Sequence, residues 1–173
     1  MRLFKHFITI NKHRWIVRKI CFKIGWYWQG LTHDLSKYSW VEFVNGAKYY
    51  LGTKSPTIAE REDKGYSAAW MHHKGRNKHH FEYWFYANEK GIYVPIKMPI
   101  KYLKEMFADR VAASKVYKGK DYSEDYPLEY LLTHRGKEML HPESFEKLKE
   151  WLTLLKDKGE KETCKIIRKE KNY

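Results

Sequence analysis

The sequence is poor in cysteine and has no long apolar run. Its two cysteines, Cys21 and Cys164, lie far apart without CxxC spacing, so neither a disulfide framework nor a zinc ribbon is expected. No segment approaches the roughly 18 consecutive apolar residues of a membrane span. The N-terminus begins like a signal peptide, but basic residues between positions 12 and 19 interrupt its apolar stretch. We therefore expect a cytoplasmic protein with no membrane partner.

What the chain does contain is a large apolar content and an excess of positive charge. Hydrophobic residues make up 43% of the 173 positions and aromatic residues 17%, which suits one folded domain and excludes a disordered chain. Lysine and arginine number 34 against 21 aspartate and glutamate, a net charge of +13. A charge of this size favours a polyanionic or phosphorylated partner, and it leaves the oligomeric state open.

Apolar residues at helical spacing predict helices along the chain. The first helix is predicted over residues 3–24, before Gly25, from a stripe of Leu3, Phe7, Ile10, His13, Ile16, Val17, Ile20 and Ile24. Ser39 and Glu42 form a capping box that starts a helix to about Leu51. Further helices are predicted over residues 67–73, 79–88, 99–118, 142–159 and 160–171. No strand alternation is found, so we expect an all-α, single-domain helical bundle with a core over about 3–118 and a C-terminal helical extension over about 140–171.

Three separate segments carry candidate metal ligands. His13 lies on the apolar stripe of the first predicted helix, His33 and Asp34 are adjacent, and Asp109 lies inside the helix predicted over 99–118, where aspartate is unfavourable. Two neutral imidazoles and two carboxylates suit a divalent transition ion such as zinc, manganese, iron, nickel or cobalt. Adjacent helical residues diverge by about 100°. His33 and Asp34 therefore share one ion only if it lies between them, unless Asp34 bridges two ions.

Each candidate ligand also has a purely structural interpretation. His13 could be a core histidine whose ring is bonded to a backbone carbonyl. Asp109 could form a surface salt bridge with Arg110 or Lys101. His6 precedes His13 by seven residues on nearly the same helix face, and whether it contributes to the site is left open.

The order of a histidine, a His-Asp pair and a distant aspartate resembles the HD-domain superfamily of metal-dependent hydrolases. The matching residues are His13, His33-Asp34 and Asp109, and Lys37 matches the lysine of the His-Asp-x-x-Lys form of the motif. This resemblance implies an HD-domain-like α-helical fold, one or two bound metal ions and hydrolysis of a phosphate ester.

The chain also resembles, over nearly its whole length, an uncharacterised bacterial and phage family catalogued as a domain of unknown function. The strings that carry this resemblance are residues 33–39, 69–84 and 98–109. Some members carry a catalase label, which the residues here argue against. A haem catalase needs a far larger chain, and a di-manganese catalase needs Glu-x-x-His pairs, whereas the nearest approach here is the reversed His79-x-x-Glu82.

The middle string holds four histidines around a basic turn predicted at 74–77, namely His72, His73, His79 and His80. Those at 73, 79 and 80 are candidate ligands of a second ion, and one of them could act as a general acid. Three basic residues between His73 and His79 could bind a phosphate group, namely Lys74, Arg76 and Lys78. The alternative is a solvated basic turn whose histidines pack between aromatic rings.

Together these features predict a metal-dependent phosphohydrolase that acts on a nucleotide or another phosphorylated small molecule. In this hypothesis Asp34 ligates and orients, His73 and His79 complete the catalytic set, and Lys37 and Arg76 offset negative charge on the phosphoryl group. Two alternatives stay open. Basic residues in the first helix and near the C-terminus could make a nucleic-acid-binding protein without catalysis. Similar ligand sets also occur in di-iron HD-type oxygenases.

Overall fold

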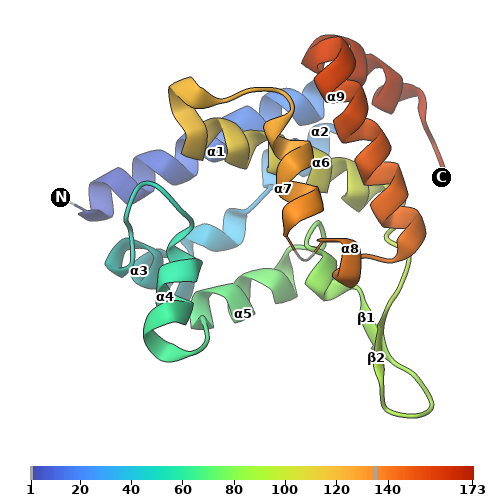
Figure 1. Cartoon of the computed structure of the whole chain (residues 1–173). Helices are drawn as coiled ribbons and strands as arrows, with labels where there is room; N and C mark the ends of the chain where they lie inside the picture. The colour runs from blue at the N-terminus through green and yellow to red at the C-terminus, as the bar shows by residue number, and fades with distance from the viewer. Residues whose placement is uncertain (1, 135) are drawn as a thin grey trace.

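The computed structural model describes residues 2–134 and 136–173, and the chain is mostly helical (Figure 1). This confirms the predicted all-α class, apart from one small hairpin. The elements in chain order are α1 (Arg2–Lys23), α2 (Tyr27–Thr32), η1 (Leu35–Tyr38), α3 (Trp40–Lys48), α4 (Pro56–Lys64), α5 (Ala68–Arg76), η2 (Phe81–Tyr83), β1 (Phe85–Ala87), β2 (Tyr93–Pro95), α6 (Ile100–Lys118), η3 (Gly119–Asp121), α7 (Tyr126–Thr133), α8 (Gly136–Met139) and α9 (Pro142–Lys169). Among the described residues, no helix is both long and apolar enough to cross a membrane.

The hydrophobic core lies between α1, α6 and α9. Helix α6 packs against both of the others (Figure 1), and its Phe107 ring meets the Trp151 ring of α9 edge-on at 6.3 Å. Such an aromatic pair contributes about 0.5–1.5 kcal/mol beyond its buried area. Residues 148–167 of α9 supply several fully buried side chains, so this helix is part of the central core rather than an addition outside it.

The apolar stripe predicted for the first helix is only partly buried. Ile10, Val17 and Ile20 are inside, but Leu3 and Phe7 are exposed, which corrects the predicted core at this end. The reason is that the N-terminal half of α1 extends towards the edge of the molecule (Figure 1). Its neighbour there is α3, a short helix that covers a narrow face of α1.

The segment after the middle histidines is not the helix predicted over residues 79–88. It forms the short 3₁₀ helix η2 and an antiparallel hairpin in which Phe85 pairs with Pro95 and Ala87 with Tyr93. Aromatic residues favour strands over helices. The loop is fixed by the Asn88 side chain, which accepts hydrogen bonds from the backbone N–H groups of residues 90 and 92. The hairpin projects away from the helices in Figure 1.

Three further boundaries differ from the predicted ones. The turn predicted at 74–77 is helical to Arg76, and the region predicted as a loop between 119 and 141 contains α7, which buries Leu131. The two helices predicted on either side of residue 159 form α9, with a kink at Gly159, where φ is 75°. Glycine adopts this positive φ without steric cost. The predicted end of one helix and start of the next is therefore a bend within α9.

Candidate metal centre

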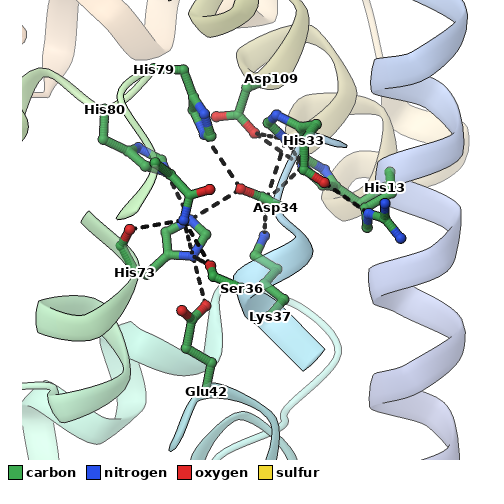
Figure 2. A network of polar contacts seen from close by, with 12 residues as sticks. His13, His33, Asp34, Ser36, Lys37, Glu42, His73, His79, His80 and Asp109 are labelled. Atoms are coloured by element: carbon green, nitrogen blue, oxygen red, sulfur yellow. Dashed lines mark hydrogen bonds and ion pairs between the residues drawn. The ribbon is translucent and has the colours of Figure 1, made fainter. Parts of the chain in front are cut away.

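Four side chains from three parts of the chain meet in a first cluster. His13 comes from α1, His33 and Asp34 from the junction between α2 and η1, and Asp109 from the middle of α6 (Figure 2). Their ligand atoms lie within 4.8 Å of one another. His13 Nε2 is 3.0 Å from Asp109 Oδ1, and His33 Nε2 is 3.3 Å from Asp34 Oδ2. The cluster combines two imidazoles and two carboxylates, the set that the sequence predicts.

A second cluster lies on the other side of Asp34. Its members are Asp34, His73, His79 and His80, whose ligand atoms again lie within 4.8 Å of one another. Asp34 Oδ1 is 3.3 Å from His73 Nε2 and 3.5 Å from His79 Nε2. His72 is not among them, because its ring turns towards Glu42, with Nδ1 2.6 Å from Oε1.

The Asp34 carboxylate therefore stands between the two clusters, as Figure 2 shows, with Oδ2 towards one and Oδ1 towards the other. Among the described residues it is the one non-glycine with positive φ, 54°. This left-handed conformation costs about 1–2 kcal/mol, and strain of this kind is concentrated at functional sites. His33 and Asp34 thus lie between two short helices, not on one helix as predicted.

The environment of Asp34 fits a bound cation. Its side chain is 1% exposed, and apart from the Lys37 ammonium 2.6 Å from Oδ2 it has no close lysine or arginine partner in the described chain. No described group gives either oxygen a well-directed hydrogen bond. Lys37 offsets charge at Oδ2, but Oδ1 has only the His73 and His79 nitrogens at 3.3 and 3.5 Å, and burying a carboxylate oxygen without a well-directed donor is unfavourable. A divalent ion in each cluster would satisfy both oxygens.

Two glutamates behind the clusters orient the histidine rings. Glu105 Oε1 is 2.9 Å from His33 Nδ1 and 3.1 Å from His79 Nδ1, and Glu42 Oε2 is 2.7 Å from His73 Nδ1. An ionised carboxylate can only accept hydrogen bonds, so each Nδ1 is the donor. Whenever such a ring is neutral, its lone pair is on Nε2, which faces Asp34. This carboxylate–histidine arrangement is the one found behind metal-ligating histidines.

Charge in the first cluster is balanced between acids and bases. Burial acts to raise the pKa of Asp34, but the neighbouring His33 and Lys37 outweigh it and hold that pKa well below its usual value. Burial also acts to raise the pKa of Asp109. The hydrogen bonds from His13 and His33 outweigh it and hold that pKa well below its usual value. Both carboxylates are therefore ionised at neutral pH, the form that binds metal.

Four histidines of the clusters divide into two groups according to the direction in which their pKa is shifted. Burial, helped by the nearby Lys37, lowers the pKa of His13, and burial with the adjacent His79 and His73 lowers the pKa of His80 well below its usual value. These two rings are neutral. Burial also acts to lower the pKa of His33 and His73, but the Asp34 carboxylate outweighs it and raises both. Without a metal, these two rings take up the positive charge that the buried carboxylates require.

The basic residues predicted to grip phosphate are separate from the clusters. Lys74, Arg76 and Lys78 make no polar contact with either cluster within the described chain. Arg76 is exposed and bonds the carbonyl of His72, and Lys78 lies over the ring of Tyr83. Helix α5 continues to Arg76, so Lys74 and Arg76 lie in its last turn instead of in a separate turn, and binding of phosphate by these residues stays a prediction.

Several residues at the site were missed by the sequence analysis. Glu105 had a usable signal, because it precedes Asp109 by four residues and shares its helix face. Glu42 was interpreted as the second half of a capping box, yet its carboxylate bonds His72 and His73 while only Ser39 caps α3. His6 lies away from both clusters, against the rings of Phe43 and Tyr50.

Comparison with known proteins places the chain in a family. A family model matches residues 2–154, a range that includes both clusters, and the family is described as a family of unknown function (DUF5662). No curated protein and no solved structure matches the chain. The predicted relation to an uncharacterised family is thereby confirmed. The resemblance to HD-domain hydrolases stays a prediction.

Proposed function

This chain belongs to the family DUF5662, and we propose that it is a metal-dependent hydrolase that cleaves a phosphate ester of a nucleotide or another small molecule. The observation that carries the proposal is the position of the Asp34 carboxylate between two sets of ligand atoms. The residue order that resembles the HD-domain superfamily supports the same reaction class.

The ligands fit one or two ions of zinc, manganese, iron, nickel or cobalt. The first set offers two nitrogens and two carboxylates, and the second offers three nitrogens and the shared carboxylate. Nitrogen-rich sets of this kind suit transition metals better than magnesium or calcium. When bound, such an ion lowers the pKa of a water molecule and polarises a phosphoryl oxygen.

Lys37 is the residue placed to meet the substrate. Its ammonium is 2.6 Å from Asp34 Oδ2, and its side chain remains 30% exposed, whereas Asp34 itself is 1% exposed. Asp109, at 18%, and His80 are the other partly open members of the clusters. Substrate therefore reaches the clusters from the side of Lys37 and Asp109. There the lysine charge can offset negative charge that develops on the phosphoryl oxygens.

The other side chains hold the clusters in place. The Arg14 guanidinium donates hydrogen bonds to the carbonyls of His33 and Leu31, which fixes the junction before the strained Asp34. Glu105 and Glu42 keep the protons of their histidine partners on Nδ1. Asn77 donates to Ser36 Oγ and to the His73 carbonyl, and so ties the end of α5 to η1.

The test is metal analysis of the purified protein, followed by assays on a panel of nucleotides and on bis(p-nitrophenyl) phosphate. We expect one or two transition ions per chain and phosphate-ester cleavage that is lost with a chelator and restored by added metal. Asp34→Asn should lose bound metal and lower turnover by about 100-fold or more. Asp121→Asn, at an exposed aspartate of η3, is the matched control and should match the wild type. Full metal content in Asp34→Asn would place the site elsewhere.

The shared carboxylate also supports the di-iron oxygenase alternative, because one bridging acid can hold two irons. One experiment distinguishes the hydrolase from the oxygenase. Iron-loaded protein that consumes dioxygen with an added organic substrate, but leaves every phosphate ester intact, would favour the oxygenase. Cleavage of phosphate esters under anaerobic conditions would favour the hydrolase.

A further inference from the structure

The outer face of α1 carries an apolar stripe that the rest of the described chain leaves exposed. Phe4, Ile8, Trp15 and Phe22 follow one another at intervals of four and seven residues, which places them within about 40° of one another around the helix. All four are exposed, with Trp15 at 48%. The stripe is about 27 Å long and lies opposite the face that carries His13.

The stripe continues onto α2 without a break. The rings of Phe22 and Tyr27 are 5.2 Å apart in an edge-on contact. Trp28 follows at 71% exposure, and Leu31 of the same helix is also exposed. Large apolar side chains gathered in this way mark a binding surface more often than isolated ones do.

The segment that carries the stripe has charged residues of a single sign, and Glu160 of α9 pairs with one of them, Lys23. Residues 1–33 contain no aspartate or glutamate and seven basic residues, namely Arg2, Lys5, Lys12, Arg14, Arg18, Lys19 and Lys23. Lys5, Lys12 and Lys19 recur every seven residues and therefore form a row along one flank of the stripe. None of these three forms an ion pair with the described residues. We therefore expect any partner of this face to carry negative charge.

We propose that α1 and α2 bind this protein to the surface of an anionic lipid bilayer, with α1 parallel to the membrane plane. Interfacial helices have this composition, with lysines beside a row of phenylalanine, tryptophan and aliphatic residues. The apolar side chains enter the boundary between headgroups and acyl chains, and the lysine stems reach the phosphates. The proposed attachment is peripheral, and it departs from the expectation of no membrane partner that the lack of a long apolar run suggested.

Two other occupants fit the surface less well. A second copy of this chain would bring two rows of unpaired lysines together, which is electrostatically unfavourable. A single-stranded nucleic acid would meet the lysines and stack on the aromatic rings. It would gain nothing from Ile8 and Leu31, whose exposed aliphatic side chains suit acyl chains.

The test is co-sedimentation of the full chain with vesicles of phosphatidylserine mixed with phosphatidylcholine, and with vesicles of phosphatidylcholine alone. We expect binding to the mixed vesicles only. The variant Lys5→Gln/Lys12→Gln/Lys19→Gln should bind them about tenfold or more weakly. The matched control is Lys156→Gln/Lys158→Gln/Lys161→Gln, which removes the same charge from exposed positions of α9 and should bind like the wild type.

A second variant tests the apolar part. Ile8→Ser/Trp15→Ser changes exposed side chains only, so circular dichroism should be unchanged while vesicle binding falls.

Equal loss in the α9 control, binding of an oligonucleotide without binding of vesicles, or burial of the stripe in a homodimer would each overturn the proposal. Asp34→Asn should bind vesicles normally, since lipid binding does not depend on the metal centre. Failure of the hydrolase assay and failure of the lipid assay are therefore distinguishable.

Discussion

Glu105 Oε1 lies 2.9 Å from Nδ1 of His33, on the opposite side of the ring from Asp34. The same oxygen is 3.1 Å from Nδ1 of His79, so one carboxylate orients a histidine of each cluster. Glu105 is on α6 one turn before Asp109. A rigid helix thus supplies both a ligand to the first cluster and the support for rings in both.

Replacing Glu105 should weaken metal binding at both clusters. Glu105→Ala leaves His33 and His79 free to rotate or change tautomer, and we expect an affinity loss of about 10–100-fold, measured by calorimetric titration with zinc or manganese. Glu105→Gln retains an acceptor oxygen and should lose less. Glu162→Gln, at an exposed glutamate paired with Lys165, serves as the control. Unchanged affinity in Glu105→Ala would mean that the rings are held by packing alone.

The number of bound ions should depend on which cluster is altered. His80 belongs only to the second set and Asp109 only to the first, whereas Asp34 belongs to both. If the wild type binds two ions, His80→Ala and Asp109→Asn should each bind one and Asp34→Asn none. Equilibrium dialysis with elemental analysis measures this. A wild type with one ion that is lost in Asp109→Asn but kept in His80→Ala would restrict the site to the first cluster.

The left-handed backbone at Asp34 gives a stability prediction that does not depend on metal. Asp34→Gly and Asp34→Ala remove the same carboxylate, but glycine adopts a φ of 54° without strain. We expect the glycine variant to be more stable than the alanine variant by about 1–2 kcal/mol, measured by urea unfolding in the presence of a chelator. Equal stabilities would show that the backbone relaxes once the carboxylate is gone.

The sequence predicted which residues come together in the first cluster better than it predicted their geometry. Residue type and order were enough to pick His13, His33, Asp34 and Asp109, because few structural roles require buried histidines and acids in that combination. The left-handed turn at Asp34 depends on contacts from α1 and α6, which no local pattern contains. The hairpin at residues 85–95 was missed for a similar reason, since its aromatic residues also match a helical stripe.

The uneven burial of α1 had no signal in the sequence either. Its apolar residues occur on nearly every side of the helix, so periodicity could not separate the face that packs from the stripe that stays exposed. Phe7 and Ile10 look alike in the sequence, yet Ile10 is buried and Phe7 is 43% exposed. The fold decides between them, because α3 and α6 cover only one side.

Two glycines in helices should respond oppositely to alanine. A Cβ at Gly46 of α3 would lie 2.3 Å from Nε2 of the buried His6, whereas a Cβ at Gly75 of α5 meets nothing within 4 Å. We expect Gly46→Ala to destabilise the fold by about 1–3 kcal/mol. Gly75→Ala should be neutral or stabilising by up to about 1 kcal/mol. Thermal unfolding of the pair checks this, and a tolerated Gly46→Ala would mean that His6 can move aside.

An ion-pair group between helices should make stability depend on pH. Glu160 on α9 pairs with Lys23 of α1 and Lys115 of α6. Burial acts to raise the pKa of Glu160, but these two ammonium groups outweigh it and lower that pKa. Because the folded pKa lies below the unfolded one, the contribution is complete above the unfolded pKa and is lost as the pH falls through the folded pKa.

Glu160→Gln should therefore cost about 1–2 kcal/mol at pH 7. The difference from the wild type should narrow below about pH 4.5, near the ordinary pKa of glutamate. Urea unfolding at several pH values measures it, with Glu146→Gln at an exposed position of the same helix as the control. A difference that stays constant down to pH 3 would assign the effect to packing instead of charge.

The ligands of the two clusters come from α1, the α2–η1 junction, the α5–η2 region and α6, which are separated by up to 96 positions between His13 and Asp109. No short fragment of the chain can therefore assemble the centre. An ion bound there would act as a cross-link that closes several long loops at once, and it would favour the native state by mass action. The melting temperature of this protein should consequently rise with the concentration of free metal, so a thermal shift screen could identify the preferred ion before any substrate is known.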